Sequence, residues 1–180
     1  MKSPSIENLL EADHISLDDL IIQLCAALEE RDVERSFARL DLMWARLAVH
    51  IRAEHLCLFP ALLDAARQLS TSEEGAPRFD EAQGLINQLR RDHDFFMTEL
   101  ARAVNAMREM MNAQDSGASE ERLREVRQTI SIVKARLAEH NKLEEEQVYR
   151  WPAALLNSSR QAQLNECVRR EIENLPSRFA

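Results

Sequence analysis

Two histidine–glutamate pairs stand beside the most hydrophobic segments of the chain. The stretch HIRAEHLCLFPALL holds His50 and Glu54, and the stretch HNKLEEEQVYRWPA holds His140 and Glu144. Residues four apart on an α-helix lie about one turn apart on the same face, so each pair can direct an imidazole and a carboxylate to one place. Neutral imidazoles and anionic carboxylates are metal ligands, so these residue types at this spacing indicate a metal site.

A single histidine precedes each of these pairs, which gives the chain a faint internal repeat. His14 stands in EADHISLDDL ahead of the first pair, and His93 stands in LRRDHDFFMTEL ahead of the second. Four histidines and two glutamates are therefore the residues that could do metal chemistry. Whether they can act together depends on the elements that position them.

The segments that carry these residues have the apolar spacing of long helices. Ala, Leu, Glu and Arg dominate, with only three glycines and five prolines in 180 residues, which favours long helices. Ser5 is the expected N-cap of the first helix, and Pro60 predicts a kink or a break inside the second. We expect helices over roughly residues 5–30, 33–69, 80–113 and 119–151, and a shorter one over about 158–175.

Short linkers separate these segments. ERDVE is expected to form a tight turn, STSEEGAPRF contains a glycine and a proline, and AQDSGAS forms the third connection. Long helices joined by short links pack as antiparallel neighbours, so the sequence predicts an all-α fold: an antiparallel up-down-up-down four-helix bundle with an additional short C-terminal helix. We expect residues 1–156 to form a four-helix metal-binding domain, and residues 157–180 to form a helical extension packed on the same domain.

The positions of the histidines relative to the turns predict that they share one layer of the bundle. His14 lies about as far before the first turn as His50 lies after it. His93 and His140 are matched in the same way about the third turn. One imidazole from each of the four helices is therefore expected at a single level.

The two glutamates are expected on the same side of that layer. Glu54 and Glu144 each lie one turn beyond a histidine, on helices that run in the same direction. Burying these groups together without a counter-ion would be costly, whereas a pair of metal ions accounts for all of them. The predicted ligands are His14, His50, Glu54, His93, His140 and Glu144.

Other polar residues near the motifs receive different interpretations. His55 lies about 140° round the helix from His50, so we expect it to be exposed. Asp18 falls far from the level of Glu54, and a surface role is expected. Glu11, three residues before His14, is a candidate additional ligand.

Charge and cysteine usage exclude several classes of function. The net charge is −8 with no long basic run, which argues against a nucleic-acid partner. No apolar run reaches membrane-spanning length, and the first residues lack the apolar stretch of an export signal. Cys25, Cys57 and Cys167 are odd in number and widely spaced, so we expect free thiols and a cytoplasmic location. Cys57 is expected to be buried as a small apolar residue.

Four motifs in order resemble the hemerythrin-like HHE cation-binding domain over about residues 5–156. HIRAEHLCLFPALL is similar to its second helix, HNKLEEEQVYRWPAAL to its fourth, and EADHISLDDL and LRRDHDFFMTEL to its first and third. The resemblance implies an antiparallel four-helix bundle that holds two non-haem iron ions. It also implies that Glu54 and Glu144 bridge the irons. His14 and His50 would then bind mainly one iron, and His93 and His140 mainly the other.

The resemblance implies a protein that handles or senses O2, NO, peroxide or iron, and it favours a metal- and ligand-binding protein over a catalyst. Oxygen-carrying hemerythrins have a further histidine one turn after that of the third helix, and here that position is Met97. One iron is therefore expected to be under-coordinated and open to O2 or NO. The alternatives are a di-iron protein for iron–sulfur cluster repair under nitrosative stress, a helical module with zinc or another divalent metal, and an interaction module with incidental histidines. The oligomeric state stays open, a homodimer included.

Overall fold

The computed structural model describes residues 5–69, 75–112 and 116–179, with side-chain surroundings from residue 120 onward in the last range. The long helices are α1 (Ile6–Glu29), α2 (Val33–Ala53), which continues through the π-helical segment η1 (Glu54–Leu58) into α3 (Phe59–Gln68), α4 (Phe79–Asn112) and α5 (Ser116–Glu146). The shorter elements are η2 (Val148–Arg150), α6 (Trp151–Leu155), α7 (Ser158–Glu173) and η3 (Ser177–Phe179).

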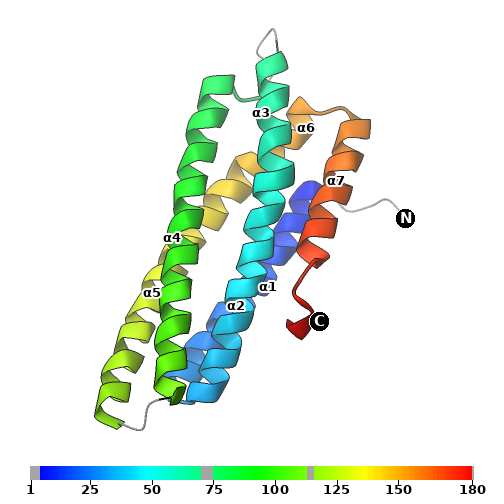
Figure 1. Cartoon of the computed structure of the whole chain (residues 1–180). Helices are drawn as coiled ribbons and strands as arrows, with labels where there is room; N and C mark the ends of the chain where they lie inside the picture. Colours follow the sequence, from blue (N-terminus) through cyan, green and yellow to red (C-terminus); the bar gives the residue numbers. More distant parts are fainter. Residues whose placement is uncertain (1–4, 70–74, 113–115, 180) are drawn as a thin grey trace.

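The long helices form an antiparallel bundle with an added C-terminal helix, as the sequence predicted. α1 packs against α2 and α5, and α4 packs against the same two helices on the other side. Figure 1 shows successive long helices running lengthwise in opposite directions. α7 lies against α1 and α2. Within the described ranges every regular element is helical.

The helix boundaries agree with the predicted ones at most ends but not in the fourth helix. The Ser5 side chain caps α1 by accepting a hydrogen bond from the Asn8 backbone N–H at 3.2 Å. α5 begins at Ser116, three residues earlier than predicted, while residues 113–115 of the predicted AQDSGAS turn lie outside the described ranges. The prediction that this helix continues to residue 151 is wrong. Gln147 leaves the helical region, with φ −125° and ψ −70°, and the chain enters η2.

The predicted irregularity at Pro60 takes the form of a π-helical segment just before it. Proline has no N–H, and its ring crowds the carbonyl four residues earlier, which disfavours a regular α-helix there. The chain responds with a wider turn, in which the Phe59 N–H donates to the carbonyl of Glu54 five residues back. Because this turn holds an extra residue, the side chains that follow Glu54 rotate relative to a regular helix.

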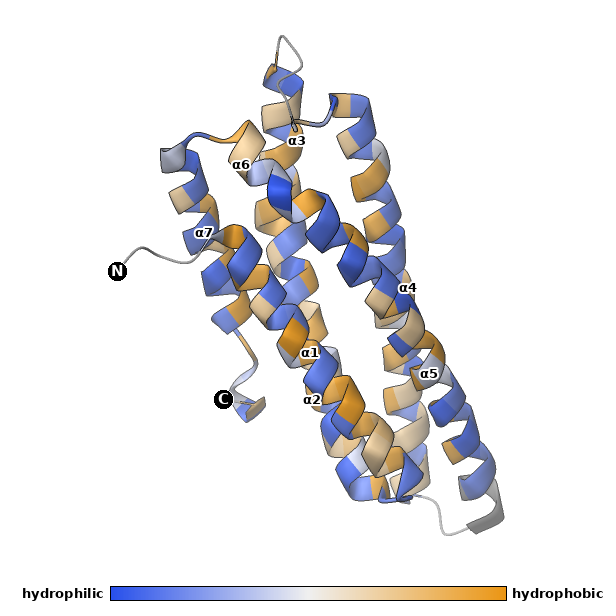
Figure 2. Ribbon diagram, turned by 180° about the vertical axis from the view of Figure 1, so that it is seen from behind, coloured by the Kyte–Doolittle hydropathy of each residue, from blue (hydrophilic) through white to orange (hydrophobic). Residues whose placement is uncertain are grey.

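Two buried hydrophobic clusters fill the bundle, one above the other in the view of Figure 1. The upper cluster includes Leu10, Phe59, Leu89 and Val148, and the lower cluster includes Leu17, Leu47, Phe96 and Leu137. Figure 2 shows hydrophobic and hydrophilic residues alternating along the long helices, as expected where one face of each is buried. In α1 and α4 the site histidine lies in the sequence between the two clusters, His14 between Leu10 and Leu17 and His93 between Leu89 and Phe96.

A disulfide joins the C-terminal helix to the bundle. Cys57 in η1 and Cys167 in α7 are bonded, with their Cα atoms 6.0 Å apart and a separation of 110 positions in the sequence. The prediction of free thiols is therefore wrong for these two cysteines, and only Cys25 is free. Packing of α7 against η1 brings the sulfurs together, which their spacing in the sequence could not indicate. A reducing compartment is therefore no longer indicated by the cysteines.

None of the helices in the described ranges combines the length and the apolar composition that a membrane span requires.

Candidate metal centre

Four histidines, one from each long helix of the bundle, meet between the two clusters. His14 comes from α1, His50 from α2, His93 from α4 and His140 from α5, and none is more than 5% exposed. The Nε2 atoms of His14 and His50 are 3.2 Å apart, and those of His93 and His140 are 2.9 Å apart. The imidazoles thus form two close pairs at the level that the turn distances predicted.

The carboxylate of Glu54 faces both pairs. It is fully buried at the start of η1. Its Oε1 lies 3.7 Å from Nε2 of His50, and its Oε2 lies 3.3 Å from Nε2 of His93. One oxygen therefore points to each half of the layer.

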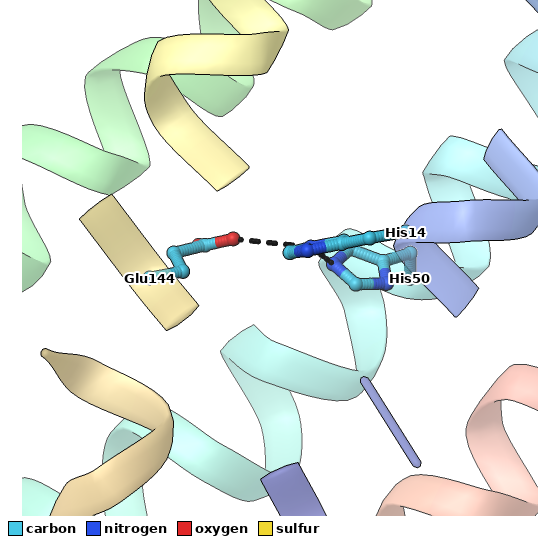
Figure 3. Close-up of side chains that lie close together, drawn as sticks. All are labelled: His14, His50 and Glu144. Atoms are coloured by element: carbon cyan, nitrogen blue, oxygen red, sulfur yellow. Dashed lines mark hydrogen bonds and ion pairs between the residues drawn. The ribbon is translucent and has the colours of Figure 1, made fainter. Parts of the chain in front are cut away.

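The carboxylate of Glu144 does the same from the opposite side of the bundle. Its Oε2 lies 3.4 Å from Nε2 of His14, and its Oε1 lies 3.1 Å from Nε2 of His140. Figure 3 shows the adjacent His14 and His50 rings with the Glu144 carboxylate directed toward them from its own helix. Among the described residues, His14, His50 and Glu144 place one ligand atom each within 4.8 Å of one another. His93, His140 and Glu144 do the same.

Every site histidine is oriented by a partner on its outer nitrogen. Nδ1 of His14 lies 2.8 Å from Oε1 of Glu145, and Nδ1 of His50 lies 2.9 Å from Oδ2 of Asp13. Nδ1 of His93 lies 2.9 Å from Nε2 of His55, and Nδ1 of His140 lies 3.5 Å from Oδ2 of Asp92. A carboxylate accepts, so three of these rings hold their proton on Nδ1 and turn the Nε2 lone pair inward. This is the arrangement that orients imidazoles for metal binding.

The inward-facing atoms fit a bound cation. In the neutral rings of His14 and His50 this tautomer places one Nε2 lone pair against the other, which is unfavourable unless a proton or a cation lies between them. Oε2 of Glu54 and Oε1 of Glu144 are also buried without a hydrogen-bond partner in the described structure. Buried polar atoms are nearly always satisfied, so a shared positive ion accounts for both observations.

The histidine charges differ between the two halves of the layer. Burial opposes a charge on His14, but its hydrogen bonds to Glu144 and Glu145 outweigh burial and raise the pKa of His14 to about 9. Burial lowers the pKa of His93 to about 4, against the opposing effect of Glu144. The carboxylates thus favour a positive charge on His14, in the first half of the layer, and burial disfavours one on His93, in the second half.

The pKa values of the two carboxylates also shift in opposite directions. Burial, together with the charge of Glu144, raises the pKa of Glu54 well above its ordinary value. Burial acts in the same direction on Glu144, but the histidines around it, His140 and His14 foremost, hold its pKa well below the ordinary value. Two buried carboxylates this close favour a shared positive charge, which a divalent ion would supply.

Tyr149 also enters the site, and sequence reasoning missed it. Its ring is 1% exposed, and its hydroxyl lies 2.8 Å from Oε1 of Glu54 and 3.0 Å from Oε2 of Glu144. Burial, with the charges of both carboxylates, raises the pKa of Tyr149 well above its ordinary value. The side chain reaches this position because α5 ends before it.

His55 corrects another prediction. It was expected to be exposed, but it is half-buried, and its Nε2 contacts Nδ1 of His93 at 2.9 Å. It lies at the start of the π-helical segment η1, on the side of α2 that packs against α4. Its ring also lies 5.6 Å from that of Phe59.

Two further sequence candidates lie outside the cluster of inward-facing atoms. Glu11 is half-buried and belongs to neither group of ligand atoms; the carboxylate that α1 supplies is Asp13, 4% exposed. Met97 is half-buried, packs against the lower cluster and lines a surface groove with Trp44 and Arg52.

A longer repeat in the sequence contains the signal that would have found the orienting residues. ARLAVHIRAE, residues 45–54, matches ARLAEHNKLE, residues 135–144, and an aspartate directly precedes the histidine of each preceding helix. In the structure Arg46 donates to Oδ1 of Asp13 at 2.8 Å, and Nε of Arg136 donates to Oδ1 of Asp92 at 3.1 Å. Each half thus has the same arginine–aspartate–histidine chain.

Comparison with known proteins agrees with this geometry. The family model of the hemerythrin HHE cation binding domain matches residues 5–152, a range that contains all six predicted ligands and Tyr149. Neither the curated proteins nor the solved structures include a match to the chain.

Proposed function

Because the chain belongs to the hemerythrin HHE cation-binding family, we propose that its buried layer holds two iron ions and binds a small diatomic ligand, O2 or NO. His14 and His50 would hold one ion, and His93 and His140 the other. The protein would handle or sense the ligand.

One observation carries the proposal: each of two buried carboxylates presents a different oxygen to each histidine pair. Glu54 contacts His50 with Oε1 and His93 with Oε2, at 3.7 Å and 3.3 Å. A carboxylate that bound a single ion would need to face only one of the histidine pairs. Carboxylates that face both halves are suited to bridging two ions and neutralising their charge.

The mixture of donors supports iron. Imidazole suits several transition metals, and carboxylate favours harder ions, so a site that combines them fits iron, with zinc and manganese as competitors. The iron would supply open coordination positions at which O2 or NO binds. The chain's own part is to hold the donors, satisfy their outer nitrogens and exclude water.

The surroundings of His93 and His140 favour a small apolar ligand. The Phe59 ring stacks on His93, with centroids 6.0 Å apart and planes 10° apart. The Phe96 ring meets His140 edge-on at 5.2 Å. Both phenylalanines are fully buried, so this half of the layer has aromatic walls rather than polar ones.

The test is to measure metal content and ligand response on the same protein. The purified chain is loaded with ferrous iron under anaerobic conditions, and its metal content is measured beside zinc- and manganese-loaded samples. We expect two irons per chain and a change in the visible spectrum on addition of O2 or NO. One iron per chain, or none, in the iron-loaded sample would contradict the di-iron proposal. Two irons with no spectral response to either gas would contradict the ligand proposal.

A further inference from the structure

The hydroxyl of Tyr149 occupies the centre of the first histidine pair. Its Oη lies 3.0 Å from Nε2 of His14, 3.4 Å from Nε2 of His50, 2.8 Å from Oε1 of Glu54 and 3.0 Å from Oε2 of Glu144. These four atoms are the ones that the proposed function assigns to the first ion. A phenol donates only one hydrogen bond, so when both imidazoles are neutral it cannot satisfy the two Nε2 lone pairs and the two carboxylate oxygens together.

No hydroxyl from the described residues occupies the corresponding place in the second half of the layer. Tyr149 lies five residues after Glu144, and Phe59 lies five residues after Glu54, so the two rings hold the same position in the repeat. Both are buried beside a site histidine: Tyr149 contacts His14 with ring centroids 5.4 Å apart, and Phe59 stacks on His93. The hydroxyl is therefore the chemical difference between two otherwise corresponding rings.

The end of α5 is what turns the tyrosine inward. On an uninterrupted α-helix, a residue five positions beyond Glu144 would lie about 140° round the axis from it. Instead α5 stops at Glu146, and the backbone turns at Gln147 into η2, which carries Tyr149. The break that sequence analysis did not predict thus delivers an oxygen to the same point as the glutamate.

We propose that Oη of Tyr149 is a ligand of the ion held by His14 and His50. The inference rests on the proposed function, because it requires an ion in that half of the layer. Binding breaks the phenol O–H bond, the proton passes to solvent, and the oxygen lone pair forms the bond to the ion, so no oxidant is consumed. A phenolate oxygen is a hard anionic donor, which suits ferric iron.

This ligand makes the centre asymmetric. The His14 half then has five protein donors: two imidazole nitrogens, one oxygen from each carboxylate and the phenolate. The His93 half has four, since Phe59 contributes none. The more open half is therefore the one lined by Phe59 and Phe96, and O2 or NO is directed to it.

The test compares the wild type with Tyr149→Phe, which removes only the hydroxyl, and with Phe59→Leu, which alters the corresponding ring and leaves the hydroxyl in place. Each protein is loaded with ferrous iron and oxidised with hexacyanoferrate(III). Metal content, the visible spectrum and the resonance Raman spectrum are recorded, with circular dichroism to check folding. Wild type and Phe59→Leu should show a phenolate charge-transfer band and tyrosine ring modes, and Tyr149→Phe should lose both. Release of iron from Tyr149→Phe to a chelator should be faster by roughly tenfold or more.

The possible failures are distinguishable. If the wild type holds two irons without phenolate modes, or if Tyr149→Phe keeps them, the tyrosine ligand is refuted and the two-iron proposal stands. If the wild type holds no iron, both are refuted. Should Tyr149→Phe fail to fold, the Raman spectrum of the wild type, with and without deuterated tyrosine, decides the assignment.

Discussion

Asp13 and Asp92 hold equivalent positions in the two halves of the bundle. Each directly precedes a site histidine and contacts Nδ1 of the histidine on the following helix, at 2.9 Å from Asp13 to His50 and at 3.5 Å from Asp92 to His140. The two contacts are not equally strong, because the Asp13 side chain is 3% exposed and that of Asp92 is 14% exposed. Asp13 therefore orients His50 more firmly than Asp92 orients His140.

Replacing these aspartates should weaken metal binding unequally. Asp13→Asn removes the negative acceptor of His50 Nδ1, and orienting partners of this kind typically contribute about 10–100-fold in metal affinity. Asp92→Asn should have a smaller effect because its contact is longer and more exposed. Titration against a competing chelator measures the affinities. Asp18→Asn, on the exposed face of α1, is the matched control, and equal affinity in the Asp13 and Asp18 variants would contradict the orienting role.

Four neighbouring glutamates should differ in their importance for metal content. Glu54→Ala and Glu144→Ala should lose most bound metal, since each carboxylate faces both histidine pairs. Glu145→Ala should lose about tenfold in affinity, because Glu145 accepts from Nδ1 of His14. Glu146 is exposed, and its alanine variant should match the wild type. Metal analysis after dialysis ranks the four, and equal content in all of them would refute the bridging assignment.

Metal affinity should rise with pH. Hydrogen bonds to Glu144 and Glu145 overcome burial and raise the pKa of His14 to about 9, so the ring carries a second proton at neutral pH. An ion at His14 requires the neutral ring, and the bound state releases this proton. The affinity should therefore increase with pH below pH 9, by about tenfold per pH unit for the proton that His14 releases. Calorimetry in buffers of different ionisation enthalpy counts the released protons. A count of zero at pH 7 would contradict the prediction.

The disulfide should stabilise the attachment of α7. Cys57 and Cys167 are 110 residues apart, and closing a chain segment of this length lowers the entropy of the unfolded state. Reduction, or Cys57→Ser, should lower the free energy of unfolding by about 2–4 kcal/mol. Urea unfolding with and without a reductant measures the change. Cys25→Ser is the control because Cys25 is free, and the idea fails if the reductant destabilises Cys57→Ser as much as the wild type.

The sequence by itself determined the four-helix arrangement and the level of the six predicted ligands. Helical geometry is local: the rise per residue fixes how far His14 and His50 lie from their common turn, and the repeat of four places Glu54 on the face of His50. Only the positions of the turns are needed, and the linkers mark them clearly. This is why two short motifs at opposite ends of the chain could be assigned to one layer before any packing was known.

The tertiary structure decided everything that depends on breaks in the helices and on contacts between them. Tyr149 faces inward because α5 ends early, and His55 contacts His93 from the segment where the helix widens before Pro60. The partners of the Nδ1 atoms depend on the rotation of one helix against the next, although the ARLA repeat contained part of that signal. The bond between Cys57 and Cys167 depends on where α7 docks. A residue's own helix fixes its height in the bundle, whereas its partner is fixed by packing, which no local spacing encodes.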